Sequence, residues 1–106
     1  MLRAGDLDRP IVIERAVDGG TTDYGEPIIA WEQRAAVRAK VVEQSGREFL
    51  SAAQIVSTRR ATFTIRWRTD LLPTDRIQWD GATWNIVGRR EIGRREALEL
   101  MAEEVK

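Results

Sequence analysis

Apolar and polar residues alternate along several stretches of the chain, which is the pattern of β-strands with one buried face. In the clearest stretch, Phe63, Ile65 and Trp67 occupy every second position, with polar residues between them. The strands predicted in this way cover residues 10–17, 28–42, 61–68, 76–79, 83–90 and 96–106. The sequence therefore predicts a mainly β fold, a small β-barrel or sandwich of about six antiparallel strands.

Two of these stretches also fit a helix. Residues 28–42 are rich in Ala, but the period-two alternation favours a strand. Residues 96–106 are strong helix formers that place Leu98 and Met101 on one helical face, whereas alternation places Leu98 and Leu100 on one strand face. Because this segment follows a hairpin-like turn after a series of predicted strands, we favour a last strand that closes the sheet.

Turn-forming residues separate the predicted strands. Asp80 and Gly81 predict a two-residue type I′ hairpin turn, and Gly88 predicts a bulge in the strand that follows. Residues 18–27 are dense in Gly, Asp and Thr, so we expect a loop there. Its expected exposure makes it a possible docking loop, with the candidate contact residues Asp23, Tyr24 and Glu26.

Residues 44–60 form one long loop or short-helix insertion between two predicted strands. Ser45 and Glu48 have the spacing of a capping box, and a narrow apolar stripe follows them. A helix this short is marginal in water, so the stripe needs a packing partner. The residues predicted to form this interface or channel arm are Ser45, Arg47, Glu48, Phe49, Leu50, Ala53, Val56, Arg59 and Arg60.

Length and composition restrict the possible functions. With 106 residues the chain is expected to form one domain, residues 1–106, and its 17 basic and 17 acidic side chains cancel. The absence of Cys and His removes disulfides, the commonest general base and the commonest metal ligand, so we expect no enzyme activity, no catalytic residues, no cofactor and no metal. No signal-peptide pattern and no long apolar run are present, so we expect synthesis in the cytoplasm and no membrane partner.

Arginines interleave with tryptophans in the second half of the chain, as in barrels that bind oligonucleotides. The residues concerned are Arg59, Arg60, Arg66, Arg68, Arg89, Arg90, Arg94 and Arg95, with Trp67, Trp79 and Trp84. The tryptophans alternate in step with Ile and Phe, which favours a place in the core. Binding of single-stranded nucleic acid stays open as an alternative, and blue-shifted, quencher-resistant Trp fluorescence would argue against it.

A series of segments along the chain resembles the phage head-tail joining family, the head-completion or stopper proteins of long-tailed phages. The segments are residues 1–7 (MLRAGDL), 9–15 (RPIVIER), 23–26 (DYGE) with Trp31, 37–41 (VRAKV), 45–48 (SGRE), 62–68 (TFTIRWR), 75–77 (DRI), 80–81 (DG), 84–87 (WNIV) and 98–105 (LELMAEEV). They follow the family order over nearly the whole chain.

The resemblance implies a single head-tail joining domain that forms a homo-oligomeric ring in the virion, hexameric or dodecameric, from subunits that can be monomers alone. The ring lies under the portal or adaptor protein, completes the head, retains the packaged DNA and docks the tail through a tail terminator or tail tube protein. Double-stranded DNA passes through the channel without sequence specificity, and no enzyme activity is implied. Another neck or tail component, such as a tail terminator or adaptor, is the nearest alternative.

Within this interpretation, we expect residues 44–60 to become ordered against a neighbouring subunit or the portal-side ring. The alternative is a helix that caps the open end of its own barrel. Strong protection of the amides of residues 49–56 in a dilute monomer would favour that alternative. We expect Arg59 and Arg60, at the base of this channel arm, to face either the DNA path or acidic groups of a partner ring.

Overall fold

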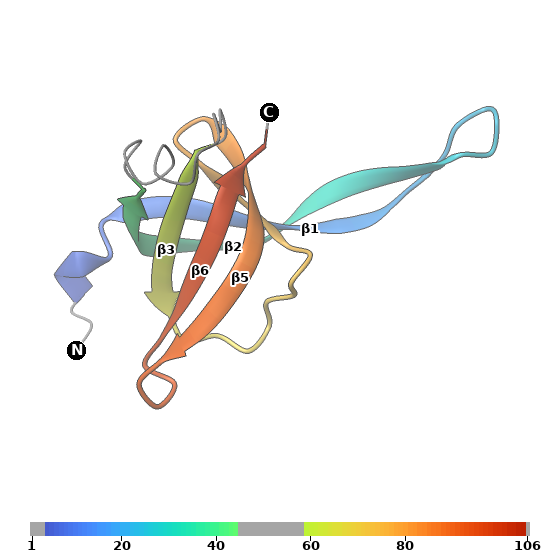
Figure 1. Cartoon of the computed structure of the whole chain (residues 1–106). Coiled ribbons are helices and arrows are strands. Elements are labelled where there is room, and N and C mark those ends of the chain that lie inside the picture. The colour runs from blue at the N-terminus through green and yellow to red at the C-terminus, as the bar shows by residue number, and fades with distance from the viewer. Residues whose placement is uncertain (1–3, 45–58, 106) are drawn as a thin grey trace.

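The computed structural model describes residues 4–44 and 59–105 as a single antiparallel sheet that closes into a barrel (Figure 1). A short 3₁₀ helix, η1 (Ala4–Asp6), precedes the strands β1 (Arg9–Thr21), β2 (Pro27–Glu43), β3 (Arg60–Arg66), β4 (Arg76–Trp79), β5 (Ala82–Ile92) and β6 (Ala97–Glu104). Their order around the barrel is β1-β2-β3-β6-β5-β4, and β4 pairs with β1 to close it. The mainly β prediction is confirmed.

Local sequence signals account for several details of this sheet. Asp80 and Gly81 both have positive φ, 54° and 73°, as a type I′ turn between β4 and β5 requires. The register of β5 against β6 shifts between Ile86 and Gly88, where the bulge was predicted. Both stretches that also fitted a helix are strands, because their alternate apolar residues face a shared core.

The core fills the barrel from all six strands and is centred on aromatic rings. Phe63 and Trp84 are fully buried and meet edge to face, with their ring centroids 5.6 Å apart. Trp79 lies 5.7 Å from each of them and accepts a hydrogen bond of 3.2 Å from the Trp84 indole N–H to its backbone oxygen. The aliphatic side chains that complete the core include Ile11, Ile13, Ile65, Ile77, Leu98 and Leu100.

The first two strands are much longer than the barrel needs. β1 pairs with β4 only over residues 12–14, yet its pairing with β2 continues to the pair Thr21–Pro27. We call residues 16–31 the arm, the part of this hairpin that extends away from the barrel in Figure 1. At about 3.3 Å per residue, the strand segment 16–21 extends roughly 20 Å.

The arm corrects the prediction that residues 18–27 form a loop throughout. β1 continues through Thr21 and β2 begins at Pro27, so only residues 22–26 form the turn. The glycines that suggested a loop instead occupy an irregularity in β1 between Asp18 and Thr21, where Gly20 has a φ of 98°. Glycine adopts this φ without steric strain, so the ladder continues beyond it.

Candidate interaction surfaces

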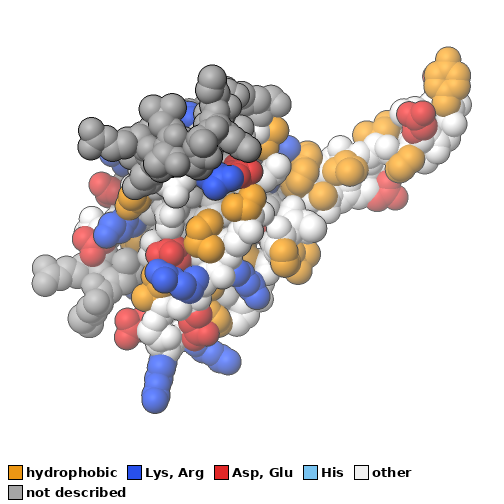
Figure 2. All heavy atoms as spheres, viewed as in Figure 1, with side chains coloured by type: hydrophobic (Ala, Val, Ile, Leu, Met, Phe, Trp, Pro, Cys, Tyr) orange, Lys and Arg blue, Asp and Glu red, His pale blue; other side chains and the backbone are white. Residues whose placement is uncertain are grey.

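The tip of the arm presents apolar side chains to solvent. Tyr24 is 94% exposed, and Ile29 is 65% exposed (Figure 2). The turn that carries Tyr24 is held by Thr22, whose hydroxyl accepts hydrogen bonds from the backbone N–H groups of Tyr24 at 3.3 Å and Glu26 at 3.1 Å. The tip is therefore an ordered turn with an aromatic side chain at its end.

The arm is also acidic. Residues 16–31 contain Asp18, Asp23 and Glu26 but no Lys or Arg, so the rest of this neutral chain carries a net charge of +3. The Asp18 carboxylate accepts a 2.9 Å hydrogen bond from the backbone N–H of Gly20. The three residues predicted for the docking loop, Asp23, Tyr24 and Glu26, thus lie together in a protruding, negatively charged turn.

A buried carboxylate fixes the root of the arm. The guanidinium of Arg15 donates two hydrogen bonds to Asp75, at 3.0 and 3.1 Å, and the Asp75 side chain is fully buried. Asp75 also accepts a 2.9 Å hydrogen bond from the backbone N–H of Leu72. The hydrogen bonds that Arg15 donates to Asp75 raise the pKa of Arg15, against the opposing effect of its desolvation. This pair joins β1, where it leaves the barrel, to the segment before β4.

A second cation supports the same root from the other side. Arg76 donates a 2.7 Å hydrogen bond to Glu14, and its guanidinium lies 3.9 Å from the centroid of the Trp31 ring. Desolvation raises the pKa of Glu14, but hydrogen bonds from Arg76 and Gln78 outweigh it, so the net shift is downward. Trp31 is thereby held against the barrel at the first ladder pair of the arm, Ala16–Trp31.

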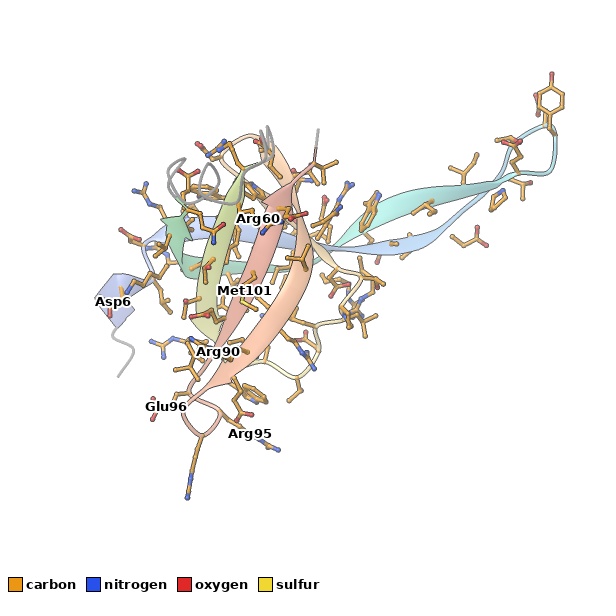
Figure 3. The ribbon with its side chains drawn as sticks, viewed as in Figure 1. Asp6, Arg60, Arg90, Arg95, Glu96 and Met101 are labelled. Atoms are coloured by element: carbon orange, nitrogen blue, oxygen red, sulfur yellow. The ribbon has the colours of Figure 1, made fainter. Side chains whose placement is uncertain are left out.

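Arg59 and Arg60, the described end of the predicted channel arm, form ion pairs within their own chain. Arg59 pairs with Glu43 and, at 3.3 Å, with Glu104, and its guanidinium lies 5.1 Å from the Trp84 ring centroid. The hydrogen bond with Glu43 raises the pKa of Arg59 against desolvation. Arg60 pairs with Glu103 (Figure 3). Contact of either arginine with DNA or a partner ring stays a prediction.

The other residues predicted for the channel arm lie outside the described part of the chain. These are Ser45, Arg47, Glu48, Phe49, Leu50, Ala53 and Val56, and their role also stays a prediction. The described residues on either side of this segment, Gln44 and Arg59, are bonded to the barrel strands. The backbone N–H of Gln44 donates a 3.0 Å hydrogen bond to the carbonyl oxygen of Arg60, and the N–H of Glu104 donates a 2.8 Å hydrogen bond to the carbonyl oxygen of Arg59.

A hollow at the end of β3 was not predicted from the sequence. It has a volume of about 340 Å³, and its apolar lining consists of Leu7, Val37, Ile65 and Trp67. Three arginines complete the lining, namely Arg38, Arg66 and Arg68, and we call this site the basic hollow. The alternation of Arg66, Trp67 and Arg68 was the signal in the sequence for a basic surface at this place. It does not show that Arg38 of β2 lines the same hollow.

The arginines of the basic hollow differ in their pairing. Arg68 donates two hydrogen bonds of 2.8 Å to Asp70, and these lower the pKa of Asp70 from its ordinary 3.8 to about 2, against the opposing effect of desolvation. Arg38 and Arg66 have no ion-pair partner among residues 4–44 and 59–105. Arg95, in the turn after β5, adds a cation 5.7 Å from the Trp67 ring centroid. The hollow therefore combines an apolar lining with positively charged side chains.

The described residues do not present a site for a metal or a membrane span. No group of three or more acidic side chains in the ranges 4–44 and 59–105 is placed to hold a metal ion. In the same ranges, no helix has the length and apolar character needed to cross a bilayer. The described residues do form a protruding arm with exposed apolar side chains and a hollow lined by arginines.

The described fold places the chain in the class of small, closed β-barrel proteins. Comparison with family models identifies the class more closely, because the model of the phage head completion protein matches residues 2–105. The chain belongs to the phage head completion protein family. It is a structural protein of the virion, part of the head-tail connector.

Solved structures support the fold. The solution structure of a Shigella flexneri 2a protein is 27% identical, with a TM-score of 0.67 over 97% of this chain and 96% of that one. A chain in the virion of a native gene transfer agent particle is 22% identical, with a TM-score of 0.62 over 93% of this chain and 96% of that one, and shares the fold. No curated protein sequence matches the chain significantly.

Proposed function

We propose that the chain forms a homo-oligomeric ring under the portal or adaptor protein, where it completes the head, retains packaged DNA and docks the tail. The arm is the observation that carries this proposal. An isolated two-stranded hairpin is at best marginally stable in water, and this one exposes Tyr24 and Ile29 beyond the barrel. Such an extension is useful only when another protein surface covers it.

The described electrostatics suit a channel that DNA crosses without being bound. The chain has no net charge, and Arg59 and Arg60 are neutralised by glutamates of their own chain. Because the whole chain has no net charge, its long-range field does not attract the phosphate backbone. A hexameric or dodecameric ring that contacts the tail terminator or tail tube protein on its other face is consistent with the family's place in the connector.

Binding of single-stranded nucleic acid is less well supported. Trp84 is fully buried, and Trp67 and Trp79 are packed against the core. Base stacking needs an exposed aromatic face. None of these three rings offers the bare platform that the alternative requires. A tail terminator or adaptor would occupy a different position in the same connector. Electron microscopy of the particle distinguishes these positions.

Electron microscopy of particles that lack the chain tests the proposal. We expect heads that package DNA, lose it and carry no tails, because nothing seals the head or offers the tail a docking surface. Supplying the chain in trans restores tailed, DNA-filled particles. Normal virions in its absence would contradict the proposal.

A further inference from the structure

We propose that the arm of one subunit docks on a second copy of this chain, with Tyr24 inserted into the basic hollow of that copy. The inference rests on the proposed ring and names the contact that closes it. It joins an acidic turn with an exposed aromatic side chain to an apolar hollow in which Arg38 and Arg66 have no ion-pair partner among residues 4–44 and 59–105.

Charge complementarity is the first support. On the arm side, Asp23 and Glu26 flank Tyr24, and no Lys or Arg occurs in residues 16–31. On the receptor side, Asp70 neutralises Arg68, which leaves Arg38 and Arg66 without an ion-pair partner in the described ranges. Opposite charges on two patches of the same chain favour contact between unlike patches and disfavour contact between like ones.

The dimensions of the hollow are the second support. Its volume of about 340 Å³ is at the lower end of pockets that enclose small ligands, about 300–1,000 Å³. Leu7, Val37 and Ile65 offer an apolar floor for an aromatic ring, while the arginines at the rim can meet the ring face and the hydroxyl. A tyrosine buried in this way, with charges around it, has the composition of an interface hot spot.

The placement of the two features is the third support. The arm leaves the barrel on one side, and η1, which directly precedes Leu7 of the hollow, lies on the other side (Figure 1). Contact between a patch on one side and a different patch on the other side is head-to-tail. Such a contact repeats from copy to copy and forms a ring when the rotation closes.

Photo-crosslinking from the arm tip tests the inference. Tyr24 is replaced by p-benzoylphenylalanine, which keeps an aromatic ring at the tip, in the full chain assembled into virions. After irradiation we expect covalent multimers of this chain beyond the dimer, because each copy both offers an arm and receives one. Mass spectrometry of the multimers is expected to place the crosslink in peptides that contain residues 37–38 or 65–68.

Leu72 supplies the matched control, because it is also an exposed apolar side chain but lies outside the hollow and the arm. The same photoreactive residue at position 72 should give no multimers of this chain linked through the hollow. Crosslinks from position 24 to another virion protein, tip-to-tip dimers alone, or no crosslink in virions that contain the protein would each overturn the inference. The ring itself is judged separately, from the neck density of the same virions.

Discussion

Arg15 and Asp75 are 60 positions apart in the sequence, and their ion pair joins β1, directly before the arm begins, to the segment before β4. The alternation in residues 10–17 correctly predicted a strand, but it gave no reason for an arginine among its apolar residues. The reason lies in a distant carboxylate that is fully buried and also receives the Leu72 N–H. A local sequence pattern cannot predict an ion pair of this kind, because its two residues come from distant parts of the chain.

Loss of the buried carboxylate should destabilise the whole barrel. We expect Asp75→Ala to lower the free energy of unfolding by about 2 kcal/mol, because the Arg15 guanidinium and the Leu72 N–H both lose a buried acceptor. Urea unfolding followed by Trp fluorescence measures the change. Asp70→Ala is the control, since Asp70 is exposed and its pair with Arg68 contributes less than about 1 kcal/mol. Equal losses in the two variants would contradict this assignment.

Acid should weaken the Arg68–Asp70 pair over a defined range. The pKa of Asp70 is lowered from 3.8 to about 2 in the folded protein, so the unfolded chain takes up its proton first. The contribution of the pair is present above about pH 4 and is lost as the pH falls toward 2. A titration of unfolding free energy should therefore be less steep between pH 4 and 2 in Asp70→Asn. Identical slopes would show that the pair does not form in solution.

At the scale of elements, the six strands could be predicted because each has an alternating face that the shared core requires. The arm could not, because its length depends on pairing between β1 and β2 that continues without a core beneath it. In the sequence, Gly19 and Gly20 indicate a turn. In the structure they belong to β1, at an irregularity in its pairing with β2. The basic hollow could not be predicted either, since it combines Arg38 of β2 and Arg66 of β3 with Leu7, which lies between η1 and β1.

The arm should unfold locally without the barrel. Gly20 has a φ of 98°, so Gly20→Ala strains the arm, and we expect faster amide exchange in residues 16–31. The free energy of global unfolding should change by less than about 0.5 kcal/mol, as for a surface substitution. Phe63→Ala is the contrast, because it empties the fully buried centre of the core and should cost about 3–5 kcal/mol. A similar global loss in Gly20→Ala would mean that the arm belongs to the cooperative unit.

At the scale of the whole molecule, a zero net charge conceals an uneven distribution. The arm carries three acidic residues and no basic one, so the remainder of the sequence carries a net charge of +3. Composition alone showed that no global field attracts nucleic acid, which agrees with a structural protein of the connector. It could not show that the charges are separated, because the separation arises only when the hairpin extends away from the barrel.

Exchanging these charges should first break and then restore assembly. We expect the double variant Asp23→Arg with Glu26→Arg, and the double variant Arg38→Glu with Arg66→Glu, each to lower the yield of tailed, DNA-filled particles about tenfold. The chain that carries all four substitutions should recover most of the yield, because opposite charges again face each other. Circular dichroism checks that each variant folds. Failure of the combined variant to recover, with all folded, would argue against contact between the two patches.

Cryo-electron microscopy of the neck of the virion tests the central claim most directly, namely that this barrel completes the head by forming a ring through its arm. The expected result is a closed ring of copies between portal and tail, in which the tip at Tyr24 of each subunit lies in the basic hollow of the next. A neck without this protein, or barrels whose arms extend away from one another, would contradict it.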